Sequence, residues 1–253
     1  MKILTGGCSV YFGQDGQVST AGTWTARTVV ARNSGAQRIT QIVSEYAPGC
    51  SPSLVNPQAE EVLYVVCGEG TCRINGFAYG LRPGAAIFVP PAAVYSVENS
   101  GAETVRVVSS CCPEDPQRHI VLGPLSESSG KPPGLLVREE VREDIHAGQD
   151  RRFRYLVNTD VGCRQITQFA GWIPPSKAPV HYHHYEEAIF ILEGSGIVHT
   201  DDASSEFTAG CSIYFPVGVR HCVENPGPVT IKLVGAFYPS GSPGEAYEPG
   251  RSE

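Results

Sequence analysis

The sequence predicts an all-β protein composed of two tandem barrels, each a jelly roll or sandwich of short strands. Apolar runs of about four to eight residues alternate with Gly and Pro, and helix-forming runs are scarce. The chain has 28 Gly and 20 Pro among 253 residues, which is typical of many strands joined by tight turns. That length leaves room for two domains of about 125 residues, each large enough to bury a core.

An internal repeat supports the two-barrel arrangement. Glu61 and Glu187 lie 126 residues apart, and so do Pro90 and Pro216. The same spacing separates four further pairs: Gly68 and Gly194, Gly70 and Gly196, Gly84 and Gly210, and Asn99 and Asn225. Self-similarity at one fixed spacing indicates a duplicated unit.

The repeat also predicts where strands and domains begin and end. Two apolar strings recur in both halves and predict equivalent strands: 60–68 with 186–194, and 84–90 with 210–216. Further strand segments are expected at 189–192 and 229–234. The domains are placed at 1–125 and 126–253, with a Pro- and Ser-rich join around 113–135. A helical turn is possible within 138–150, which resembles a linker more than a core element.

Charge and composition argue against several classes of function. The chain has 19 Lys and Arg against 26 Asp and Glu, a net charge of −7, and no basic blocks. Such a chain is a poor candidate for binding nucleic acid or an anionic membrane. No apolar run approaches the length of a membrane helix or a signal peptide, so we expect a cytoplasmic protein. The nine Cys are scattered without a Cys-x-x-Cys pair, and we expect reduced thiols.

A candidate metal site lies in the second half of the chain. His181 and His183 are two residues apart, so on a strand both imidazoles would face one cavity. Glu187 follows after a short turn, and His221 supplies a third imidazole from a later strand. Three neutral nitrogens and one carboxylate suit a single divalent transition metal: iron, manganese, nickel, copper or zinc.

These residues resemble the two signature motifs of the cupin superfamily. The first motif is matched by His181, His183, Glu187 and Gly194, and the second by Gly210, Pro216, Gly218, His221 and Asn225. Pro175 stands where the first motif opens with Gly, a position that shapes a turn and is not a ligand. The resemblance covers roughly 38–110 and 164–238. It implies two cupin barrels and a metal bound by His181, His183, Glu187 and His221.

The first half lacks the corresponding ligands. Val55, Pro57 and Tyr95 stand where the second half has its three histidines, and Glu61 alone is retained. One carboxylate cannot hold a catalytic metal tightly, so we expect a metal-free, structural first barrel. Ligand binding, for example through Tyr95 and Tyr64, is the alternative.

The resemblance favours an enzyme that acts on a small, oxygen-rich and partly apolar molecule. A dioxygenase similar to the quercetinases is the first hypothesis, with Glu187 as a ligand or as the group that takes the substrate's proton. An isomerase, decarboxylase or hydrolase is the second, because the layout also resembles ureidoglycine aminohydrolases and oxalate decarboxylases. The third is a metabolite-binding protein without catalysis, and a homo-oligomer is possible in each case. Five apolar residues are expected to line the cavity: Ile189, Ile191, Ile213, Phe215 and Val223.

Overall fold

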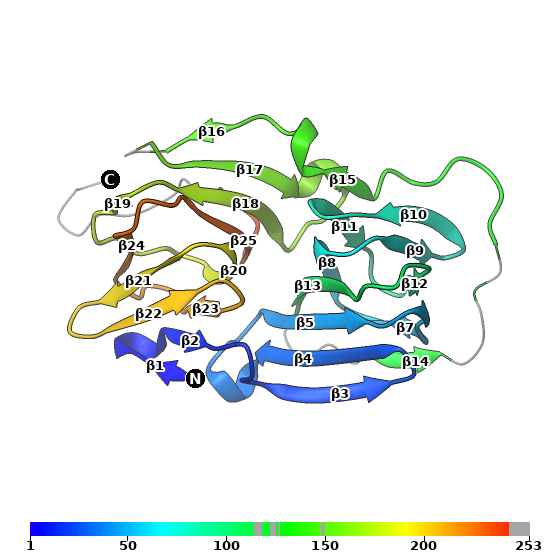
Figure 1. The fold of residues 1–253 in the computed structure, drawn as a ribbon, viewed down its shortest axis with the longest axis horizontal. Coiled ribbons are helices and arrows are strands. Elements are labelled where there is room, and N and C mark those ends of the chain that lie inside the picture. The colour runs from blue at the N-terminus through cyan, green and yellow to red at the C-terminus, as the bar shows by residue number, and fades with distance from the viewer. Residues whose placement is uncertain (114–117, 122–124, 126, 148–149, 243–253) are drawn as a thin grey trace.

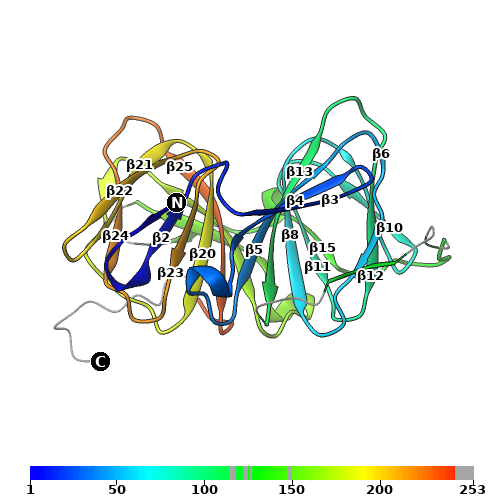
Figure 2. The same cartoon turned by 90° about the horizontal axis from the view of Figure 1, so that it is seen from below.

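Two β-barrels lie side by side in the computed structural model of the chain (Figure 1). The structure describes residues 1–113, 118–121, 125, 127–147 and 150–242. Seen from below, the two barrels form separate lobes that meet along strands near the centre of the molecule (Figure 2). In the described part of the chain, helix is limited to single 3-10 turns: η1 (Thr5–Gly7), η2 (Arg32–Ser34), η3 (Glu139–Val141) and η4 (Thr159–Val161).

The first barrel is made of two facing antiparallel sheets. One sheet has, in spatial order, β15 (Leu136–Arg138), β11 (Ala85–Val89), β8 (Glu60–Cys67), β13 (Val105–Cys112), β5 (Thr40–Tyr46), β4 (Trp24–Val30) and β3 (Gln17–Ala21). The other has β10 (Phe77–Leu81), β9 (Gly70–Ile74), β12 (Val94–Asn99), β7 (Ser53–Val55) and β14 (His119–Val121), with β6 (Gly49–Cys50) also paired to β12.

The second barrel repeats this plan. Its larger sheet has, in order, β1 (Lys2–Ile3), β2 (Ser9–Tyr11), β23 (Ser212–Phe215), β20 (Glu186–Glu193), β25 (Ile231–Tyr238), β18 (Thr167–Ile173), β17 (Arg152–Val157) and β16 (Ile145–His146). Its smaller sheet has β19 (Ser176–Lys177), β24 (His221–Asn225), β21 (Ser195–Thr200) and β22 (Ser204–Thr208). The all-β, two-barrel prediction is confirmed.

The two halves exchange a strand. β2, near the N-terminus, pairs with β23 of the second barrel, and Tyr11 lies opposite Ser212. β15, which comes after the first barrel in the chain, pairs back onto β11, and Val137 lies opposite Ala86. Each residue of one pair is 126 positions from its counterpart in the other, so the exchange follows the repeat. With the proposed domain boundary between 125 and 126, β1 and β2 precede the boundary but belong to the sheet of the second barrel, and β15 follows it but belongs to the sheet of the first.

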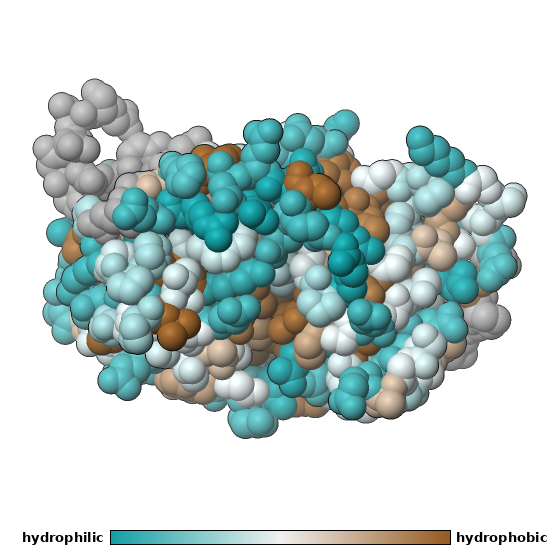
Figure 3. Space-filling view, turned by 45° about the horizontal axis from the view of Figure 1, so that its top comes forward, coloured by the Kyte–Doolittle hydropathy of each residue, from teal (hydrophilic) through white to brown (hydrophobic). Residues whose placement is uncertain are grey.

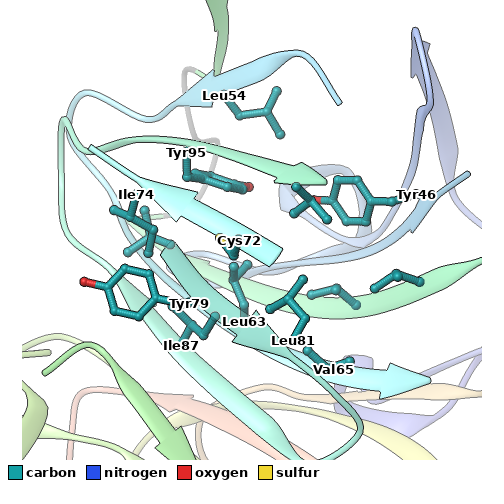
Figure 4. Close-up of a cluster of buried hydrophobic side chains, with 14 of the residues drawn as sticks. Tyr46, Leu54, Leu63, Val65, Cys72, Ile74, Tyr79, Leu81, Ile87 and Tyr95 are labelled. Atoms are coloured by element: carbon teal, nitrogen blue, oxygen red, sulfur yellow. The ribbon is translucent and has the colours of Figure 1, made fainter. Parts of the chain in front are cut away.

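Burial explains why the central strands are apolar without a break. In β8, Leu63 and Val65 point into the first barrel, as Figure 4 shows, whereas Val62 and Tyr64 face the second barrel. In β12, by contrast, only alternate residues are buried, because its outer face meets solvent. Residues 62–65 of β8 are buried from both sides and are therefore apolar at every position.

The two barrels share an apolar interface and a pair of equivalent carboxylates. Glu186 of β20 accepts hydrogen bonds from the backbone N–H groups of Gln37 and Arg38 at 3.1 and 3.0 Å. Glu60 of β8 accepts from the backbone N–H groups of Arg164 and Gln165 at 3.1 and 2.8 Å. Each barrel thus supplies a buried glutamate that caps a loop of the other barrel.

Several finer expectations can be compared with the structure. The predicted strand at 189–192 lies within β20, and the one at 229–234 begins two residues later, as β25. The turn considered within 138–150 is η3, followed by β16, although residues 148 and 149 lie outside the described part. Part of the predicted join at 113–135 also lies outside it.

No helix in the described residues is long and apolar enough to cross a membrane. Hydrophilic residues cover most of the face drawn in Figure 3, and hydrophobic residues occur there as separate patches.

Candidate metal centre

The three histidines meet at the mouth of the second barrel. His181 and His221 form an isolated antiparallel bridge, with backbone N–H···O distances of 3.0 and 2.9 Å. The carbonyl of His183 accepts from the backbone N–H of Gly218 at 2.8 Å, which ties the turn before β24 to the His-x-His segment. The segment is a single bridge and not the regular strand that the sequence suggested, yet both rings still face the same cavity.

The imidazole geometry suits a metal ion. One ring nitrogen from each of His181, His183 and His221 lies within 4.8 Å of the others. The ring centroids are 4.6 Å apart for His181 and His221, and 4.9 Å for His181 and His183. Neutral ring nitrogens converging in this way leave room for one divalent ion with open positions for other ligands.

Backbone carbonyls determine which nitrogen of two rings is available. Nδ1 of His181 donates to the carbonyl of Pro179 at 2.8 Å, and Nδ1 of His221 donates to the carbonyl of Val219 at 2.9 Å. A carbonyl accepts only, so Nδ1 carries the proton and Nε2 keeps its lone pair. This is the outer-shell arrangement that orients metal-binding histidines in proteins.

Aromatic stacking fixes the other ring planes. His183 stacks on Tyr185 with centroids 4.5 Å apart, and Tyr185 stacks in turn on Phe237 at 4.4 Å. His221 stacks on Phe215 at 4.1 Å. These contacts leave the rings little freedom to rotate.

Glu187 lies beside the three imidazoles. Its Oε2 is 3.9 Å from Nε2 of His183, but the group with all ligand atoms within 4.8 Å contains only the histidines. Burial raises the pKa of Glu187 to about 8, because a carboxylate loses its hydration there. A divalent cation would offset that cost.

The electrostatics also favour neutral imidazole. Burial, reinforced by His181 and His183, lowers the pKa of His221 to about 3. His221 therefore keeps the uncharged form that binds metals over the physiological pH range. The donor set fits a divalent transition ion: neutral nitrogens, outer-shell carbonyls and a buried carboxyl group. The metal that would bind, and the part of Glu187 in binding it, stay predictions.

A small cavity of about 140 Å³ opens over these residues. Of the five expected apolar wall residues, Ile189, Phe215 and Val223 line it, whereas Ile191 and Ile213 are buried in the barrel core. Further lining residues were missed in the sequence: Phe153, Phe169, Trp172, Leu233 and Arg151.

Among these residues, Arg151 places a positively charged group in the cavity. Its Nη2 donates to the carbonyl of Val223 at 2.7 Å, and its Nε has no hydrogen-bond partner among the described residues. Strand alternation could have predicted that Arg151 lines the cavity. Arg151 and Phe153 are two residues apart at the start of β17 and share a face.

The corresponding place in the first barrel is occupied by protein groups. Glu61 is fully buried and forms an ion pair with Arg118. The hydroxyl of Tyr95 donates to the same carboxylate at 3.2 Å. Tyr64, considered as a ligand-binding residue, instead faces the interface between the barrels, where its hydroxyl donates to Glu139. In the described part of the chain, His181, His183 and His221 are the group that could hold a metal.

Sequence comparison agrees with this architecture. The profile of the cupin domain matches residues 42–111 and 172–236, which together span more than half of the chain. The chain belongs to the cupin family. It is a two-domain cupin, with one cupin segment in each barrel and the three-histidine group in the second.

Curated relatives match over short segments. This cupin is 38% identical over 65 residues to an uncharacterised protein of Methanocaldococcus jannaschii. The matched segment is 25% of this chain and 52% of that protein. It is 39% identical over 54 residues to a mannose-1-phosphate guanylyltransferase of Salmonella montevideo, covering 21% of this chain and 11% of the relative. The match thus spans about half of the first relative and a small part of the second.

Solved structures match over nearly the whole cupin chain. Oxalate decarboxylase of Bacillus subtilis superposes with a TM-score of 0.73 at 15% identity, covering 92% of this chain and 78% of that one. Oxalate decarboxylase of Lactobacillus farciminis, solved as a formate complex, gives 0.74 at 13%, with 92% and 88% covered. A putative glyoxylate-induced protein of Pseudomonas aeruginosa gives 0.71 at 20%, with 92% and 90% covered. At these identities the likeness establishes the two-barrel fold.

Proposed function

We propose that the second barrel is the active site of a metal-dependent enzyme that acts on a small, partly apolar organic carboxylate. His181, His183 and His221 would hold one divalent transition metal. Glu187 either completes the ligand set or exchanges a proton with the substrate. A metal at this position would supply a Lewis acid for oxygen atoms of the substrate.

The carboxylate assignment depends on Arg151. Its guanidinium lines the same cavity as the three imidazoles, and its Nε lacks a partner among the described residues. Arginine binds carboxylates through paired N–H groups, and a buried unsatisfied donor is costly unless a ligand completes it. A substrate carboxylate on Arg151 would orient the rest of the molecule towards the histidines.

Size and polarity narrow the substrate further. The cavity is about 140 Å³, and Phe153, Phe169 and Leu233 contribute apolar walls. A molecule of a few carbons fits this space better than a large polyphenol. In the metal-free site the pKa of Glu187 is about 8, so its carboxyl group is protonated at neutral pH, and its Oε2 lies 3.9 Å from Nε2 of His183.

Decarboxylation is the reaction we favour within this proposal. Arg151 would hold a carboxylate, and Glu187 would deliver its proton to the carbon that loses carbon dioxide. The fold shared with oxalate decarboxylases supports this class. Dioxygenation is the second candidate, because the apolar walls also suit an enolic or aromatic substrate that reacts with O2.

Elemental analysis of protein purified without added metal tests the site. We expect about one transition metal per chain in the wild type and none in the His181→Ala/His221→Ala variant. The matched control is His199→Ala, because His199 lies in the same barrel, pairs with Glu224 and does not line the cavity. Metal retained by the double variant would mean that the site lies elsewhere.

Turnover assays then distinguish the reactions. The metal-loaded protein is given small 2-oxo, 2-hydroxy and dicarboxylic acids with and without O2, and release of carbon dioxide is measured. Release that is independent of O2 supports a decarboxylase, whereas consumption of O2 with an enolic substrate supports a dioxygenase. Metal binding without turnover of any acid would favour a metabolite-binding cupin.

A further inference from the structure

A second and larger cavity lies in the first barrel. Its volume is about 500 Å³, and residues of β3, β4, β5 and the β14 segment line it. The repeat relates it to the metal cavity, with a spacing of 127 in these strands, since β5 begins at Thr40 and β18 at Thr167. Trp24, Ala26 and Ile42 line it at positions 127 residues before Arg151, Phe153 and Phe169. The two barrels therefore open at equivalent places.

Side-chain size explains why this cavity is the larger one. Two phenylalanines that narrow the second cavity are replaced by Ala26 and Ile42 in the first. The space that these substitutions free is the kind of pre-formed pocket that small molecules occupy.

Arg118 lies where the first barrel has lost its metal ligands. Its side chain is only 10% exposed and lines the cavity. Nη2 contacts the carboxylate of Glu61 and Sγ of Cys111, but Nε has no hydrogen-bond partner among the described residues. In the core of the same barrel, Figure 4 shows Tyr46 and Tyr95 with their hydroxyl groups directed towards each other.

We propose that this cavity is a metal-free binding site for a small organic monocarboxylate, held by Arg118 against the ring of Trp24. The guanidinium lies 5.9 Å from the centre of that ring, so a planar ligand on the arginine would contact the indole. The proposal does not depend on the reaction assigned to the second barrel.

Charge favours one negative charge on the ligand. None of the described residues that line the cavity is acidic, and Arg32 lines it together with Arg118. Glu61 already neutralises part of the field of Arg118, so a carboxylate fits better than a doubly charged phosphate. Apolar walls from Ile42, Leu54 and Ile120 suit an organic body behind the carboxylate.

Tryptophan fluorescence can report on this cavity alone. The chain has two Trp, and Trp172 lines the metal cavity, so Trp172→Phe leaves Trp24 as the single reporter. The probe is benzoate, titrated to millimolar concentration, and benzamide is its uncharged control. We expect a saturable change with benzoate and a much weaker one with benzamide. An equal response to both, or no saturable response to benzoate, would overturn the proposal.

Variants in the Trp172→Phe background identify the residues. Glu61→Gln with Arg118→Met removes both charges together, leaves no buried ion unpaired, and should weaken benzoate binding about tenfold or more. Ala26→Phe introduces the bulk of Phe153 and should block binding while both charges remain. Arg106→Gln is the matched control, since Arg106 is an exposed arginine paired with Glu45 outside the cavity.

Thermal unfolding of each variant shows that it is folded before it is titrated. Binding unchanged in both the Glu61→Gln/Arg118→Met and the Ala26→Phe variants would overturn the proposal. A benzoate-soaked crystal provides a measurement that needs no variant: we expect the carboxylate on Arg118. Benzoate found only on the histidines of the second barrel would contradict it.

Discussion

At the scale of single residues, backbone groups prepare the candidate metal site. The carbonyls of Pro179 and Val219 accept hydrogen bonds from Nδ1 of His181 and His221, so the Nε2 atoms of both rings keep their lone pairs. These acceptors are each two residues from the histidine they orient. The site is therefore arranged locally, before any ligand arrives.

Burial of Glu187 makes the stability of the metal-free protein depend on pH. Its pKa is about 8 in the folded chain against an ordinary 4.5, so the folded state binds the extra proton between these values. Stability from this group is therefore lost as pH rises from 4.5 to about 8. We expect Glu187→Gln to become progressively more stable than wild type over this range, by a few kcal/mol at the upper end, since one pKa unit is worth about 1.4 kcal/mol.

Denaturant unfolding with a chelator present measures this difference. The pKa of His221 is lowered from 6.5 to about 3, so this residue adds stability with rising pH only below 6.5. Above that pH it is neutral in both states, and the remaining slope isolates Glu187. If the difference in unfolding free energy between wild type and Glu187→Gln did not change with pH above 6.5, burial would not raise the pKa of Glu187.

Arg151 should determine substrate affinity more than rate. We expect Arg151→Gln to raise KM for a carboxylate substrate about tenfold or more, because a charged hydrogen bond is lost. Arg154→Gln is the control, since Arg154 pairs with Asp144 near Trp172 but does not line the cavity. Steady-state kinetics of both variants, with the acid that the turnover assays identify as substrate, would decide. Equal KM values in wild type and Arg151→Gln would remove Arg151 from the substrate site.

At the scale of elements, tight turns between strands require glycine where backbones approach closely. Gly68, between β8 and β9, has φ +82°, and a Cβ there would lie 2.6 Å from the carbonyl oxygen of Thr104. Gly35, after η2, has φ +96° but open space around its Cβ position. A side chain at Gly35 would meet only backbone strain, whereas a side chain at Gly68 would meet both backbone strain and a steric clash.

We expect Gly68→Ala to cost clearly more stability than Gly35→Ala. The second change adds only the left-handed backbone penalty of about 1 kcal/mol, whereas the first also forces backbone atoms apart. Equilibrium denaturation of the two variants gives the comparison. Equal losses would show that the turn at Gly68 relaxes without cost.

At the scale of the whole molecule, the barrels are joined as one unit. Strand exchange puts β2 and β15 into the opposite sheets, and an apolar cluster with members from both halves lies between them. Glu60 and Glu186 add equivalent hydrogen bonds across this interface. A single cooperative unfolding transition is the expected consequence.

Replacing either interface glutamate should weaken the molecule to a similar degree. We expect Glu60→Gln and Glu186→Gln each to cost about 1–3 kcal/mol, since charged hydrogen bonds to part-buried backbone N–H groups are lost. Glu45→Gln, which removes one partner of an exposed ion pair with Arg106, should cost at most about 1 kcal/mol. Chemical denaturation followed by fluorescence tests all three. A split into two transitions would show that the barrels unfold separately.

The sequence by itself determined the two all-β barrels, their equivalence and the grouping of His181, His183 and His221. The barrels and their equivalence follow from the fixed repeat spacing and the short apolar runs, His181 and His183 share a face by strand alternation, and His221 joins them through the resemblance to the cupin motifs. The tertiary structure alone decided the strand exchange, the presence of Arg151 in the metal cavity and the pairing of Glu61 with Arg118. Arg118 comes from a segment that precedes β14, and no repeat or periodicity relates it to Glu61. Such contacts depend on how distant segments pack, and strand patterns do not encode that.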